Sequence, residues 1–105
     1  YKVDQRKMTV EQAWAWGEGK NEYCSPVTGL CEYQKDKDSI VAYFSTTSEG
    51  GFAGWATGTL FTKMNPFITE FSWGATEPDV IIKLRHSMGY QAFPFDVQKA
   101  FDPQK

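Results

Sequence analysis

Two cysteines carry the most distinctive chemistry in this chain of 105 residues. Between Cys24 and Cys31 lie six residues, and Pro26 and Gly29 among them favour a loop that turns back on itself. We predict a disulfide between the two sulfurs, which would stabilise the fold by roughly 2 to 2.5 kcal/mol on the chain-entropy model. Disulfides persist in oxidising compartments, so the pair predicts a secreted or periplasmic protein. Two free buried thiols in a cytosolic protein are the alternative.

No metal site, cofactor or catalytic group emerges from the other reactive residues. The cysteine spacing excludes a Cys-x-x-Cys redox motif, and a single histidine is too few for a zinc site. On a predicted helix that histidine, His86, projects away from the apolar stripe, toward solvent. Glu70 is the best candidate for one of a pair of catalytic carboxylates, but 13 acidic residues make some pairing inevitable. We therefore predict a protein that is not an enzyme, with a small hydrolase using Glu70 or His86 as an alternative.

The aromatic residues indicate a binding surface instead. They make up 16% of the chain, more large rings than a small core needs, and such rings are enriched where proteins meet. We predict a small protein-binding module that acts by occlusion, such as an inhibitor or immunity-type protein, with another protein as its partner. The predicted partner-binding residues are Trp16, Tyr23, Tyr43, Glu49 and Trp55.

Charge and hydropathy bear on whether the chain binds nucleic acid or enters a membrane. The net charge is −2 and the pI about 5.3, without a basic cluster, so we predict no nucleic-acid partner. A single-stranded nucleic-acid binder stays an alternative, because bases could stack on the aromatic strands and phosphates could pair with the nearby lysines. No apolar run is long enough to span a bilayer. Because the chain begins at Tyr1 and not at Met, it is expected to have lost a leader or anchor or to be part of something longer. A periplasmic domain of a membrane-anchored envelope or secretion assembly is a further alternative.

The elements that must position these residues form a predicted antiparallel meander. Residues 40–47, 52–64 and 67–73 are rich in aromatic, Thr and β-branched residues, with turn signals at 48–51 and 65–66. The turn at 48–51 is Gly-rich, but a predicted strand follows it, which argues against a phosphate-binding loop. A short strand is also predicted to begin in residues 31–34.

Two helices are predicted to cover the sheet. Thr9 and Gln12 form a capping box before a helix at 10–16. Residues 80–88 carry the apolar stripe Val80, Ile81, Leu84 and Met88. The predicted fold class is therefore α+β: an antiparallel meander of three to five strands with two short helices packed on one face. Residues 1–8 are an extended lead-in, and residues 9–105 form a single α+β domain.

The predicted middle strand has an unusual row of small residues. Gly54, Ala56 and Gly58 fall on one of its faces and would leave a smooth trough. The trough either seats a helix or forms a binding groove. Beyond the second helix, residues 90–93 are predicted to add a short strand. Asp96 is predicted to cap a final turn in which Val97 and Phe101 face inward.

Overall fold

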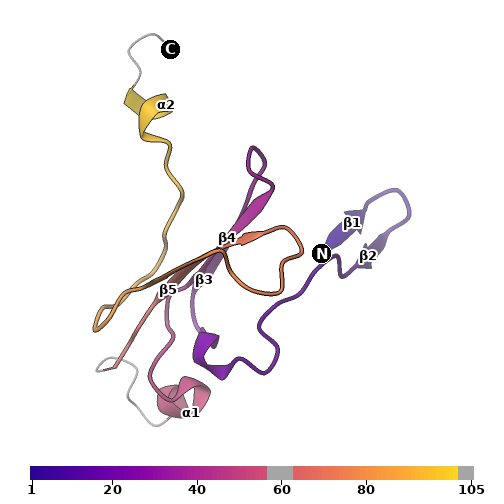
Figure 1. Cartoon of the computed structure of the whole chain (residues 1–105). Helices are drawn as coiled ribbons and strands as arrows, with labels where there is room; N and C mark the ends of the chain where they lie inside the picture. Colours follow the sequence, from indigo (N-terminus) through magenta and orange to yellow (C-terminus); the bar gives the residue numbers. More distant parts are fainter. Residues whose placement is uncertain (57–62, 102–105) are drawn as a thin grey trace.

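The computed structural model describes residues 1–56 and 63–101, and a four-stranded antiparallel sheet is its centre (Figure 1). Its strands pair in chain order: β3 (Gly29–Gln34), β4 (Ser39–Phe44), β5 (Phe67–Ser72) and β6 (Val80–Lys83). An antiparallel meander forms as predicted, with β4 and β5 close to the predicted first and third strands. The predicted α+β class is wrong, because the fold is mostly β and the helices of the described residues are two short segments and one 3-10 turn.

Both faces of this sheet carry apolar side chains. Residues paired across antiparallel strands point to the same side, so the register assigns each residue to a face. We call one side the aromatic face; it is formed mainly by Tyr33, Ile40, Phe44, Phe67 and Phe71. The other side, the second face, is formed mainly by Leu30, Val41, Tyr43, Ile68, Glu70, Val80 and Ile82. A sheet of this kind must be covered on both sides.

The C-terminal segment supplies part of the cover on the second face. Gly89 lies so close to Tyr43 that a Cβ at Gly89 would be 1.6 Å from the tyrosine hydroxyl. Further on, Phe93 and Pro94 line a small pocket together with Val41 and Ile82. Three residues of β6 nevertheless remain 44 to 50% exposed: Val80, Ile81 and Ile82.

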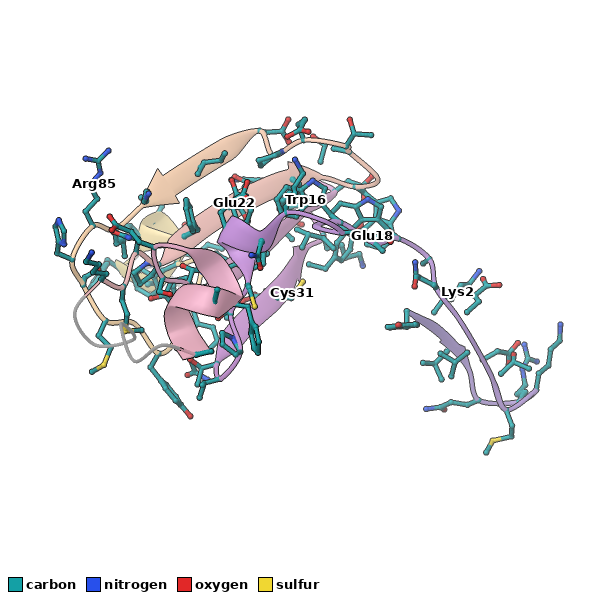
Figure 2. The ribbon with its side chains drawn as sticks, turned by 90° about the horizontal axis from the view of Figure 1, so that it is seen from below. Lys2, Trp16, Glu18, Glu22, Cys31 and Arg85 are labelled. Atoms are coloured by element: carbon teal, nitrogen blue, oxygen red, sulfur yellow. The ribbon has the colours of Figure 1, made fainter. Side chains whose placement is uncertain are left out.

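A separate hairpin stands at the N-terminus. Strands β1 (Lys2–Asp4) and β2 (Thr9–Glu11) pair antiparallel with each other and with no other strand of the described chain. Figures 1 and 2 show them apart from the four-stranded sheet. Val3 and Val10, which face each other in the register, are 62% and 64% exposed. Burial in this chain therefore contributes little to the hairpin.

Both predicted covering helices are wrong. Thr9–Glu11 is strand β2, and the following residues run without regular structure. Val80–Lys83 is strand β6, because its β-branched run, Val80 to Ile82, fits a pleated edge beside β5. The apolar spacing of residues 80–88 matched a helical stripe, but β5 offered a strand edge to pair with. Local periodicity could not show that edge.

The predicted middle strand is also wrong where the structure describes it. Gly51–Ala56 is the short helix α1, which follows a tight turn and packs on the 3-10 turn η1 (Asn21–Tyr23). A Cβ at Gly51 would lie 2.6 Å from the Asn21 carbonyl oxygen, so this glycine allows the close approach. Gly54 and Ala56 are thus on a helix, and Gly58 lies outside the described residues.

At the C-terminus the predictions were partly right. The expected strand at 90–93 does not form, whereas a single-turn helix, α2 (Val97–Phe101), does. Asp96 Oδ1 accepts a hydrogen bond from the Lys99 backbone N–H at 2.9 Å, which confirms the predicted cap. Val97 and Phe101 were expected to face inward. They are 63% and 75% exposed, because no sheet lies beneath this turn.

A cluster of hydroxyl groups fixes the loop that enters β3. Ser25 Oγ donates to the Thr28 carbonyl at 2.5 Å, contacts Thr46 Oγ1 at 3.0 Å and accepts from the Thr46 N–H at 3.0 Å. Thr28 Oγ1 hydrogen-bonds to Ser45 Oγ. Ser45 and Thr46 are buried, so these groups satisfy each other where water does not reach.

We predict that Ser25→Ala lowers the free energy of unfolding by about 1 to 3 kcal/mol, because it leaves the Thr46 N–H without its acceptor in a buried site. Urea denaturation followed by circular dichroism measures the change. Ser87→Ala is the matched control, since Ser87 Oγ donates only to the exposed Leu84 carbonyl, and it should change stability by less than about 0.5 kcal/mol. Equal effects of the two substitutions would show that the cluster does not hold the loop.

Candidate functional site: an aromatic cleft

The segment between β2 and η1 crosses the aromatic face in an extended form. We call residues 12–20 the strap. Its Trp16 ring packs edge-on against Phe71 at 4.7 Å between centroids, and Trp14 does so at 5.5 Å. Tyr23, just after the strap, lies 4.7 Å from Phe67 and 4.9 Å from Trp16. Edge-to-face packing of this kind stabilises beyond the buried area.

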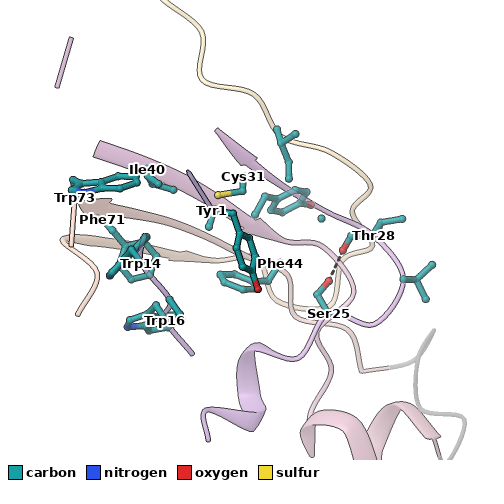
Figure 3. A pocket seen from close by; sticks show the side chains of 16 residues that line it. Tyr1, Trp14, Trp16, Ser25, Thr28, Cys31, Ile40, Phe44, Phe71 and Trp73 are labelled. Carbon is teal, nitrogen blue, oxygen red and sulfur yellow. Dashed lines mark hydrogen bonds between the residues drawn. The ribbon is translucent and has the colours of Figure 1, made fainter. Parts of the chain in front are cut away.

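A cleft of about 600 Å³ opens between the strap and the sheet (Figure 3). Cavities of this size hold small-molecule ligands. Three kinds of residue line it. The aromatic lining residues are Tyr1, Trp14, Trp16, Tyr43, Phe44, Phe71 and Trp73; the aliphatic ones are Ala15, Val27, Leu30, Ile40 and Ala42; and the polar ones are Ser25, Thr28 and Cys31, with Gly29 completing the wall.

This lining has the chemistry suited to an uncharged aromatic group. It contains no His, Lys, Arg, Asp or Glu side chain among the residues that the structure describes. Buried charges need partners, so an anionic group would be poorly held here, whereas a flat ring can stack on Trp14 or Trp73. The cleft can therefore bind and orient a ring but has no obvious acid or base for chemistry.

A second, smaller pocket adjoins the cleft and shares Trp16 and Phe44 with it. Here a cation is present, since Lys20 Nζ lies 5.4 Å from the centre of the Trp16 ring. Tyr23 also lines this pocket, and its partial burial, reinforced by the neighbouring Glu22, raises the pKa of its hydroxyl. Tyr23 therefore stays protonated at neutral pH.

The predicted disulfide is wrong: Cys24 and Cys31 are both free. Cys31 is on β3 and points to the aromatic face, where it lines the cleft. Cys24 follows the 3-10 turn, outside the lining of the cleft but within that of the second pocket. The loop between them turns back as expected, but the hydroxyl cluster of Ser25, Thr28 and Thr46 holds it instead of a cross-link.

Neither hydrolase candidate is part of the cleft. Glu70 is on the second face, where its Oε1 accepts from Ser39 Oγ at 2.7 Å and lies 3.9 Å from Lys37 Nζ. His86 is exposed in the turn after β6, with φ at 53°. Glu70 pairs with Val80, the first residue of β6, whereas His86 follows the end of β6. Glu70 and His86 therefore lie near opposite ends of that strand.

The predicted partner-binding residues are spread over several environments. Trp16 and Tyr23 are half-buried around the strap, and Tyr43 is buried on the second face. Glu49 is exposed, 4.0 Å from Lys63 Nζ. The side chain of Trp55 lies outside the described residues. The structure brings Trp16 and Tyr23 together, and a role of these five residues in binding another protein stays a prediction.

The described residues contain neither a group of metal-binding side chains nor a membrane-spanning helix. No three His, Cys, Asp or Glu side chains among them are grouped to hold a metal ion. None of their helices has the length and apolar character required to cross a membrane.

Comparison with known proteins identifies the family. The model of the arylsulfotransferase family matches residues 1–92, so the chain belongs to this family. The chain is similar to two proteins named arylsulfate sulfotransferase AssT. One, from Lelliottia amnigena, is 39% identical over 44 residues, and the other, from Escherichia coli O6:H1 (strain CFT073), is 36% identical over 44 residues. No solved structure matches.

The aligned segment is a small part of those relatives. It covers 41% of this chain but 7% of each AssT protein. The family match nevertheless corrects two predictions. The chain was expected not to be an enzyme, and it belongs to a family of enzymes; the inhibitor or immunity-type function is wrong for the same reason.

Three residues of the cleft were missed by sequence reasoning. Phe71 and Trp73 fall in or at the end of the strand predicted at residues 67–73, and the structure places Phe71 on β5, against the strap. Trp14 was assigned to a helix. The signal that could have placed it is the alternation of Trp14 and Trp16, which fits an extended segment lying on an apolar sheet as well as a helix.

We predict that alkylation in denaturant labels both cysteines without any reductant, as read by intact mass. In the native protein, Cys31 should react more slowly at pH 7.5 than free cysteine does. Partial burial raises the pKa of its thiol and so lowers its thiolate fraction. Labels that appear only after reduction would show that the disulfide forms after all.

Proposed function

We propose that this chain contributes an aryl-binding cleft to an enzyme that transfers sulfuryl groups between aromatic compounds. The observation that carries the proposal is the uncharged, ring-rich lining of the cleft, in a chain that belongs to the arylsulfotransferase family. The name of the two relatives, arylsulfate sulfotransferase, supplies the substrate class.

The lining also indicates which end of the substrate is held. A sulfate group carries negative charge and needs cations or several hydrogen-bond donors. The described lining of the cleft contains neither charged side chains nor a cluster of amide donors, whereas its rings suit the aryl part of a donor or a phenolic acceptor. The chain thus positions the ring, and the groups that transfer the sulfuryl unit come from elsewhere in the enzyme.

The exposed apolar surface supports a role within a larger assembly of sheets. Among the described residues, 18 large hydrophobic side chains are exposed, while the buried apolar core is formed by four: Ile40, Tyr43, Met64 and Phe71. Four-stranded antiparallel sheets that are apolar on both faces are stable when they stack on other sheets, as the blades of β-propellers do. We propose that β3 to β6 form such a unit.

We also propose a location outside the cytoplasm. The support for it is membership of the arylsulfotransferase family, since the free cysteines remove the argument from a disulfide. Fractionation of the native host tests it: the chain should be released with the envelope fraction, and recovery with cytosolic marker enzymes would contradict the proposal.

We predict that the chain binds a simple arenol such as 2-naphthol and that Trp73→Ala weakens this binding about five- to tenfold, because a stacking surface is lost. Trp73 is 47% exposed, so its removal should leave the fold intact. Fluorescence titration of the arenol measures the dissociation constant.

Tyr90→Ala is the matched control. Tyr90 is an exposed aromatic residue outside the lining of the cleft, and its removal should leave binding unchanged. Equal weakening by both substitutions, or an arenol that does not bind at all, would contradict an aryl site in this cleft.

A further inference from the structure

We propose that the strap is a gate over the aromatic cleft and that two contacts with the loop between β5 and β6 latch it shut. This inference rests on the proposed function, because it concerns access to the same cleft. The strap forms one wall through Trp14 and Trp16, and the sheet forms the other through Phe44 and Phe71. The space between these walls widens when the strap moves away from the sheet.

The first latch contact is a hydrogen bond. The indole N–H of Trp16 donates to the backbone carbonyl of Thr76 at 2.8 Å, across 60 positions of the chain. Trp16 lines both pockets and packs on Phe71 and Tyr23, so this bond fixes the ring that separates the two spaces. Breaking it costs a hydrogen bond at the surface, which is a small free energy.

The second latch contact is an ion pair beside the first. Lys20 Nζ lies 3.5 Å from Glu77 Oε1, and the same ammonium lies over the Trp16 ring. Their side chains are 36% and 71% exposed, so the pair is partly screened by water and can break readily. The two contacts therefore join the strap to two consecutive residues of one loop, the first to Thr76 and the second to Glu77.

Between these contacts the strap contains a two-glycine turn, closed by a hydrogen bond from the Lys20 backbone N–H to the Gly17 carbonyl at 3.0 Å, which we propose as the hinge. Gly17 and Gly19 have φ values of 98° and 75°, and a Cβ at either position would meet no atom within 4 Å. Positive φ at glycine costs little, and the surrounding open space leaves room for rotation. The strap belongs to no strand of the described chain, so its movement breaks no sheet pairing. A weak latch next to two glycines is suited to opening and closing.

The test compares Glu77→Gln with Glu18→Gln. Both remove one negative charge near Lys20, but Glu18 is exposed and takes part in no ion pair among the described residues. Stopped-flow fluorescence with 2-naphthol gives the association and dissociation rate constants. A gate predicts that Glu77→Gln raises both about two- to fivefold and changes the dissociation constant by less than twofold, because opening limits both entry and exit. Glu18→Gln should match the wild type.

A second measurement needs no ligand. Hydrogen exchange of residues 14–20 should be faster in Glu77→Gln than in Glu18→Gln, while exchange in β4 and β5 stays unchanged. If 2-naphthol fails to bind but this difference appears, the gate stands and the aryl site is wrong. If both variants exchange equally, or if Glu77→Gln changes only the dissociation rate constant, the strap is a fixed wall and the gate is overturned.

Discussion

A sheet that is apolar on both sides is the constraint on which this structure depends. Strands β3 to β6 place rings and β-branched side chains on each face, so neither face is stable against water. The strap covers the aromatic face with Trp14 and Trp16, and the segment around Gly89 and Phe93 partly covers the other. The cleft exists because the strap covers its face with large rings that leave space between them.

Two kinds of contact hold the surrounding segments to that sheet. Rings in edge-to-face contact hold the strap to the aromatic face, and a buried set of Ser and Thr hydroxyls holds the loop that enters β3. The hydroxyls act where a cross-link between Cys24 and Cys31 was expected, and they leave both thiols free. The Cys31 thiol is thereby part of the cleft wall, and desolvation raises its pKa so that it behaves as a neutral group there.

Membership of the arylsulfotransferase family suggests a kind of ligand for the ring-rich cleft, which the geometry of the cleft alone does not identify. Two of the residues that were expected to contact another protein, Trp16 and Tyr43, belong to the lining of a space sized for a small molecule. In this interpretation Trp16 has two roles, because it packs on Phe71 and is also tied to Thr76 at the edge of the strap. The proposed packing on further sheets would cover the remaining exposed apolar surface, above all on β6.

The sequence by itself determined the strands around Ile40 and Phe71 and the cap at Asp96. These follow from alternation, β-branched residues and local hydrogen-bonding groups, which act over a few positions. Only the tertiary structure decided that residues 10–16 and 80–88 do not form helices. Their apolar spacing fits either state, and pairing with β5 or packing on a sheet face distant in the chain selects the extended one. The cleft depends on that choice, because Trp16 in one wall and Phe71 in the other are far apart along the chain and meet only when the strap crosses the sheet.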